Sequence, residues 1–184
     1  MAVKTFTTGE VLTAANTNTY LTNAGLVYIA DTTVSAASTV AIDNCFTTTY
    51  AHYFITYNLT SSLTGQYTSV RLRSGGTAKA TNYDRANFFV GTTGTTGADT
   101  FGTAQTELNI AGQSSTLIAG HFYFYNPQVS GRTAFSGIGQ YNGNAYWGGG
   151  TQTDTYSADG FQIFASGNAA TYTGTVRVYG LRQS

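Results

Sequence analysis

Charge is scarce in this chain. Of 184 residues, 8 are Lys or Arg and 8 are Asp or Glu, so the charged fraction is 9% and the formal net charge is zero. Nucleic-acid-binding proteins carry clustered positive charge, which this composition does not supply. No apolar run approaches the ~20 residues of a membrane-spanning helix, and Met1–Thr8 lacks the apolar centre of a secretory signal. We therefore expect no nucleic-acid partner and no membrane insertion.

Cysteine and proline are also scarce, with one residue of each. A single cysteine, Cys45, excludes a disulfide within the chain and fits a thiol buried as a small apolar group. The chain is instead rich in Thr, its commonest residue, and has 22 Gly, 14 Tyr and 11 Phe. Thr and aromatic residues favour strands, and Gly favours turns. The aromatic residues fall in alternating runs, which indicates a packed β domain and not a disordered chain.

One stretch, Gly9–Leu21, predicts a helix. The Thr13 hydroxyl can cap it, and Gly25 suits the left-handed residue that follows a helix end. A helix of about three turns is marginal alone in water, so it needs a surface to lie on. Residues 1–12 before it are expected to be extended. Its narrow apolar face has the spacing i, i+3, i+4 and i+7 and consists of Thr17, Tyr20, Leu21 and Ala24.

The pattern after Gly25 predicts strands separated by Gly, Asn and Asp turns. Both faces of Tyr50–Tyr57 are partly apolar, which is typical of a strand in the middle of a sheet. Val70 and Leu72 should point into the core, and Ser69 should point outward. We expect strands at residues 26–30, 33–44, 50–57, 66–73, 83–90, 101–111, 116–125, 132–141, 161–165 and 171–181.

About eight to ten strands at this spacing indicate an all-β fold, a jelly-roll-like antiparallel β-sandwich preceded by one short N-terminal helix. The chain divides accordingly into residues 1–24, with the helix, and residues 25–184, the sandwich. Two Gly-rich tracts predict exposed loops. They are Gly91–Thr100 and the stretch from Gly139 to Gly150. In the second, Asn142-Gly143-Asn144 is a strong turn signal directly after the strand at 132–141.

The sequence contains no recognisable catalytic constellation. The Gly-x-Ser-x-Gly elbow and the phosphate-binding glycine motifs are absent, and most acidic residues stand in turn contexts. His52 and His121 with one cysteine do not form a metal-ligand spacing, although the two histidines could meet on neighbouring strands. We therefore expect a non-enzymatic protein without catalytic residues, a metal ion or a cofactor.

Aromatic residues in loops are better candidates for recognition. Tyr141, Tyr146 and Trp147 lie among Asn and Gly residues in the predicted loop between Gly139 and Gly150. An exposed aromatic ring can stack on a sugar while amide side chains bind its hydroxyls. The alternative is that Trp147 fills the core or a subunit interface.

Four short motifs carry a resemblance to a known family. They are Gly9-Glu10-Val11-Leu12-Thr13-Ala14-Ala15 with Asn18-Thr19-Tyr20-Leu21, Ser69-Val70-Arg71-Leu72-Arg73-Ser74 with its Gly pair, Asp159-Gly160-Phe161, and Gly174-Thr175-Val176-Arg177-Val178-Tyr179-Gly180-Leu181-Arg182. The chain thereby resembles tailed-phage virion structural proteins of the tail-fibre, minor-tail or head-decoration type. Members of that family usually carry Asp and a Val-like residue where this chain has Asn16 and Thr17.

The resemblance implies an N-terminal attachment segment followed by an exposed β domain on the virion exterior. Two functions follow. In the first, the chain is a structural virion component, a short fibre or decoration protein that docks onto capsid, portal or tail proteins and forms a homotrimer. In the second, the β domain is a lectin-like tip that binds a host surface glycan through Tyr141, Tyr146 and Trp147. The residues expected to anchor the chain to the virion are Phe6, Val11, Leu12, Thr17, Tyr20 and Leu21.

Overall fold

The computed structural model describes residues 7–11, 13, 25–94 and 96–182, and within them the chain forms thirteen strands and no helix. The strands are β1 (Leu26–Ala37), β2 (Thr39–Ile42), β3 (Tyr50–Ser61), β4 (Tyr67–Ser74), β5 (Thr77–Ala78), β6 (Tyr83–Val90), β7 (Thr96–Gln105), β8 (Leu108–Gly112), β9 (Ile118–Tyr125), β10 (Gly131–Tyr141), β11 (Asn144–Tyr156), β12 (Gly160–Ser166) and β13 (Tyr172–Arg182).

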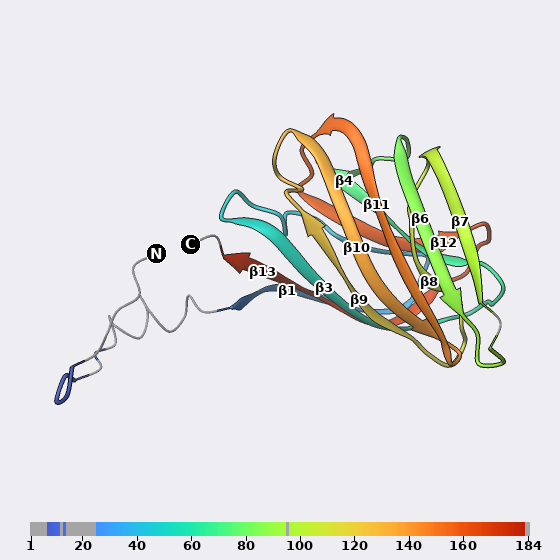
Figure 1. Ribbon diagram of the computed structural model, residues 1–184, viewed down its shortest axis with the longest axis horizontal. Helices are drawn as coiled ribbons and strands as arrows, with labels where there is room; N and C mark the ends of the chain where they lie inside the picture. The colour runs from blue at the N-terminus through green and yellow to red at the C-terminus, as the bar shows by residue number, and fades with distance from the viewer. Residues whose placement is uncertain (1–6, 12, 14–24, 95, 183–184) are drawn as a thin grey trace.

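The strands form two antiparallel sheets that pack face to face (Figure 1). The large sheet has eight strands in the order β1-β13-β3-β9-β10-β11-β6-β7. The small sheet has the order β2-β12-β4-β5, and β8 pairs with β4 as well. The fold is therefore an all-β sandwich, as the sequence predicts.

The core between the sheets is rich in aromatic rings. Tyr53, Phe122 and Phe124 of the large sheet and Phe161 of the small sheet are each 0% exposed. The rings of Phe122, Phe124 and Phe161 contact one another edge to face or tilted, with the Phe122 and Phe161 centroids 5.8 Å apart. Alternation along each strand puts these rings on the inner face, because successive strand residues point to opposite faces. Such pairs stabilise a core beyond the area that they bury.

Glycines on the inner face of the large sheet let β8 approach its backbone closely. A Cβ atom on Gly139 would lie 2.2 Å from the Ile110 carbonyl oxygen, and one on Gly148 would lie 3.1 Å from that of Asn109. A Cβ on Gly150 would lie 2.7 Å from the Leu108 side chain. Glycine inside a strand often marks such an approach. The Gly148–Gly150 run is therefore part of β11, and the loop predicted between Gly139 and Gly150 is wrong.

The turn predicted at Asn142-Gly143-Asn144 is confirmed, because a two-residue turn connects β10 and β11. Tyr141 pairs with Asn144, and the turn residues Asn142 and Gly143 have φ angles of 46° and 79°. Positive φ at both positions is the signature of a type I′ hairpin, for which Asn-Gly is the preferred sequence.

Other strand predictions hold with changes. Tyr50–Tyr57 lies inside β3, between β13 and β9, and is central as predicted. Val70 and Leu72 are 0% exposed, but Ser69, predicted to point outward, is also 0% exposed because β8 covers it. The loop predicted at Gly91–Thr100 is wrong in its second half, since β7 begins at Thr96 and pairs with β6.

A buried ion cluster ties β4 to β6. The carboxylate of Glu107, in a residue only 7% exposed, lies 3.1 Å from the Arg71 guanidinium and 3.2 Å from that of Arg85. The hydroxyls of Thr106 and Ser166 also donate to it. Burial by itself would raise the pKa of Glu107, but these four donors together lower it below its ordinary value.

The N-terminal predictions fall mostly outside the described residues. Of the helix predicted at Gly9–Leu21, only residues 9–11 and Thr13 are described, and none of them is helical. Where residues 7–10 are described they form a turn, with the Glu10 amide donating to the Thr7 carbonyl at 3.0 Å and Gly9 at φ 89°. The extended conformation predicted for residues 1–12 is therefore wrong at this turn.

Candidate functional site

The outer face of the large sheet, which the small sheet does not cover, carries an unusual row of residues. Strand register places one residue from each of the eight strands side by side. The row begins with four aromatic side chains, continues with three small residues, and ends on a phenylalanine. In strand order it is Tyr28, Tyr179, Phe54, Tyr123, Ser136, Gly149, Ala86 and Phe101.

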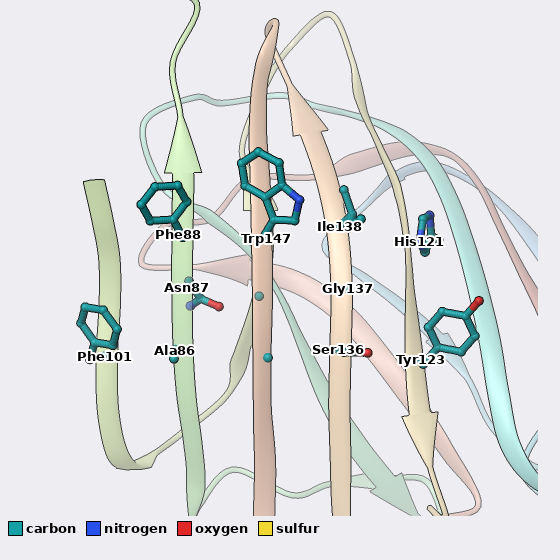
Figure 2. Close-up of a pocket in the computed structure, with 12 residues that line it drawn as sticks. Ala86, Asn87, Phe88, Phe101, His121, Tyr123, Ser136, Gly137, Ile138 and Trp147 are labelled. Carbon is teal, nitrogen blue, oxygen red and sulfur yellow. The ribbon is translucent and has the colours of Figure 1, made fainter. Parts of the chain in front are cut away.

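The three small residues form the floor of an open hollow with a volume of about 590 Å³. Phe101 and Tyr123 bound the floor at its two ends, and Phe88, Trp147 and Ile138 stand along one side. Figure 2 shows these side chains in two parallel rows, with Ser136 and Ala86 between the rings. The lining residues come from five adjacent strands, β9, β10, β11, β6 and β7. Cross-strand neighbours on one face of a sheet lie close together, so these side chains border a single hollow.

The aromatic walls are exposed although they are apolar. Trp147 is 41% exposed, Phe88 45% and Phe101 69%. The Trp147 and Phe88 rings lie 6.1 Å apart at their centroids, tilted by 41°. Grouped exposed apolar side chains on a folded domain mark interaction sites more often than single ones do.

Among the residues whose side chains the structure describes, the lining of the hollow contains no charged one. Its polar side chains are those of His121, Tyr123 and Ser136, since the buried Asn87 contributes backbone and turns its side chain to the inner face. The Ser136 hydroxyl lies 2.8 Å from that of Tyr125, so one hydrogen bond already holds it in place. An apolar pocket with a few polar groups at its edge is the usual form of a small-ligand site.

The structure separates the three residues predicted to bind a glycan. Trp147 lines the hollow, but its neighbour Tyr146 is 0% exposed on the inner face of the same strand. Tyr141 is half-buried against the core and lines a different, polar hollow with Gly65 and Gln113. The site therefore retains only Trp147 from the predicted set.

Sequence reasoning missed Phe88, Phe101, Tyr123 and Ile138. Phe88 and Tyr123 occur in predicted strands, and Phe101 stands at the start of one, but no local pattern relates them to Trp147. Only the pairing of β9, β10, β11, β6 and β7 brings them together.

The residues predicted to anchor the chain are largely undescribed. Val11 is 76% exposed. Phe6, Leu12, Thr17, Tyr20 and Leu21 lie outside the described residues.

The two histidines lie on neighbouring strands, β3 and β9, but do not meet. His52 stands opposite Tyr125, and His121 stands opposite Thr56, two rows further along. Among the described residues, no group of three or more His, Cys, Asp or Glu side chains is placed to hold a metal ion.

Fold and site together define the class coarsely, as an all-β sandwich with an exposed aromatic hollow on its large sheet. No family model and no curated protein matches the chain. Among solved structures, the galectin LEC-6 of Caenorhabditis elegans is similar with a TM-score of 0.38 and 12% identity, over 80% of this chain and 94% of the galectin. A likeness of this size identifies no ligand, so we base the functional proposal on this chain's own residues.

Proposed function

We propose that the sandwich is a non-enzymatic binding module that holds a sugar ring of a neutral glycan in the hollow. The observation that carries this proposal is the position of Trp147. The only tryptophan of the chain stands exposed beside a floor of small residues, in a hollow whose described lining residues carry no charge. The preceding residue, Tyr146, is 0% exposed, so the same strand also has a buried position that holds a large aromatic side chain.

The chemistry of the hollow matches both surfaces of a sugar ring. The C–H face of a sugar is apolar and can lie on an aromatic ring, while its hydroxyls need donors and acceptors around the edge. Trp147 and Phe88 supply the rings, and His121 and Tyr123 supply polar edges. Tyrosine and tryptophan suit such sites because one end of the side chain is apolar and the other can form hydrogen bonds.

A glycan array probed with the purified full-length chain tests the proposal. We expect neutral glycans to be bound, and Trp147→Ala to lower the affinity at least about tenfold, equivalent to about 1.4 kcal/mol. Leu63→Ala is the matched control, because Leu63 is 46% exposed and lies outside the hollow. Unchanged affinity in Trp147→Ala, or no glycan bound by the wild-type chain, would contradict the proposal.

We further propose, from the family resemblance, that the chain is a tailed-phage virion protein attached through residues 1–24. The position of the domain's ends favours this arrangement. Leu26 pairs with Leu181 at the β1–β13 edge of the large sheet, whereas the hollow lies over β9, β10, β11, β6 and β7 (Figure 1). Attachment at the first edge leaves the second free. In this proposal a jelly-roll-like domain, trimeric on the virion exterior, presents the hollow to the host.

Deletion of residues 1–24 tests the attachment. We expect the truncated chain to remain soluble, to keep its glycan binding, and to be lost from assembled particles, because every described strand begins at or after Leu26. Leu21→Ala should give a weaker version of the same loss. Immunoblotting of purified particles measures incorporation. A truncated chain that still joins particles would overturn the role given to Phe6, Val11, Leu12, Thr17, Tyr20 and Leu21.

A further inference from the structure

A second hollow continues the first one. It has a volume of about 570 Å³ and shares Ala86, Phe101 and Gly149 with its neighbour. From these shared residues it extends along β6, β7 and β11 to Asp84, Thr103 and Thr151. The two hollows therefore form one groove on the outer face, which runs obliquely from Tyr123 and His121 to Asp84.

The groove is longer than a single sugar ring. Four strand spacings separate Tyr123 on β9 from Phe101 on β7, which amounts to about 19 Å across the sheet. The row between them holds only Ser136, Gly149 and Ala86. The aromatic row is thus interrupted over three consecutive strands and resumes at Phe101.

The charges beside the groove favour a neutral ligand over an anionic one. Asp84 supplies a carboxylate at one end, and one of its oxygens accepts a hydrogen bond from the Ala104 amide at 3.1 Å. The guanidinium of Arg85 is turned inward, 3.2 Å from the Glu107 carboxylate. A lining carboxylate repels an acidic sugar but can accept hydrogen bonds from hydroxyls.

We infer that the ligand is a linear neutral oligosaccharide of more than one ring that lies along this groove. This inference rests on the proposed function. One ring lies beside Trp147, and the chain continues over Gly149, past Phe101, towards the hydroxyls of Thr103 and Thr151 and the carboxylate of Asp84. A single sugar would leave half of the groove unfilled.

The fluorescence of Trp147 provides the measurement, because this residue is the only tryptophan and lies in the groove. The full-length chain is titrated with maltose-, cellulose- and chitin-series oligosaccharides, from monosaccharide to hexasaccharide, and with acidic oligogalacturonates. We expect the affinity for one neutral series to rise at least tenfold between monosaccharide and tetrasaccharide, with no binding of the acidic series.

The possible failures are distinguishable. A monosaccharide that binds as tightly as its longer oligomers would overturn the inference and leave the proposed function standing. Tighter binding of the acidic series would overturn the neutral ligand class. A chain that binds none of these sugars and no glycan of an array would overturn both proposals together.

Gly149→Val blocks the junction of the two hollows. A Cβ atom on Gly149 would meet only the Phe135 carbonyl oxygen, at an ordinary 3.6 Å, so the fold accommodates it while the side chain fills the groove. We expect this variant to lose most of the gain in affinity with ligand length. Gly131→Val is the matched control, since a Cβ on Gly131 meets nothing within 4 Å and Gly131 is remote from the groove. Equal oligosaccharide binding by the two variants would refute the continuous groove.

Discussion

The two faces of the large sheet use the same residue types for different purposes. On the inner face, Phe122 and Tyr146 are 0% exposed, and the Phe122 ring packs among other rings. On the outer face, Phe88 and Trp147 are 45% and 41% exposed and border a hollow. Tyr146 and Trp147 are neighbours in the sequence, yet one is part of the core and the other part of the candidate site.

Glycine shows the same contrast within a single tripeptide. Gly148 and Gly150 face inward, where a Cβ would meet Asn87 Oδ1 at 2.6 Å and the Asp84 carbonyl oxygen at 2.3 Å. Gly149 faces outward, where a side chain has room. The inner glycines are required for packing and the outer one is not. Core packing therefore does not require a glycine at position 149, and the hollow there is a property of the outer surface.

The largest difference between the faces should appear in the inner-face variant Phe122→Ala. The Phe122 ring contacts four others at centroid distances of 5.4 to 5.9 Å. Its removal leaves a cavity in a close-packed core, so we expect the free energy of unfolding to fall by about 3–5 kcal/mol. Guanidinium denaturation measures the change. A loss below about 1 kcal/mol would mean that the core rearranges to fill the space. The rings that contact Phe122 are Tyr57, Phe124, Phe135 and Phe161.

A somewhat smaller effect is expected at the buried charges on the inner side. Because the pKa of Glu107 is lowered in the fold, its ionised form stabilises the protein above the pKa of the unfolded chain, about 4.3. This contribution should be lost as the pH falls through the lower folded pKa. Glu107→Gln leaves Arg71 and Arg85 without a counterion, and we expect it to cost about 3 kcal/mol at neutral pH and to flatten the acid dependence.

Asp154→Asn is the control for this acid dependence. Asp154 pairs with Lys79 at 2.5 Å, but its side chain is 31% exposed, so water screens the pair. We expect its effect on stability at neutral pH to be much smaller than that of Glu107→Gln. Unfolding curves at a series of pH values compare the two variants. Equal effects would contradict the distinction between charges inside the sandwich and charges at its surface.

The sequence predicted the inner face far better than the outer one. Period-two alternation marks Val70 and Leu72 as inward residues, and both are 0% exposed. The same alternation fails at Ser69, because it cannot show that a second strand, β8, covers that position. Alternation reports only how residues within one strand are divided between its faces.

The candidate site depends on register, which local patterns do not contain. Trp147, Phe88 and Tyr123 come from three strands and become neighbours only through pairing. The Gly148–Gly150 run predicts a loop by composition, because glycine at a turn and glycine at a close approach of two backbones look alike in a sequence. Trp147 was identified as an aromatic residue in a predicted loop, and it lines the hollow although that stretch belongs to β11.

The smallest change in stability is expected for Phe88→Ala, the outer-face counterpart of Phe122→Ala. The cross-strand contact between Phe88 and Trp147 is the ring contact that the variant removes, and such pairs contribute roughly 0.2–1 kcal/mol. We expect the free energy of unfolding to change by less than about 1 kcal/mol while glycan affinity falls, because the ring serves the ligand and not the core. The Phe88 ring is exposed either because it contacts a ligand or because a second copy of the chain covers it in an oligomer. Denaturation at several protein concentrations, together with sedimentation of the native chain, distinguishes these two explanations. A large loss of stability that grows on dilution would show that a second copy of the chain covers this face, and the hollow would then be a subunit interface.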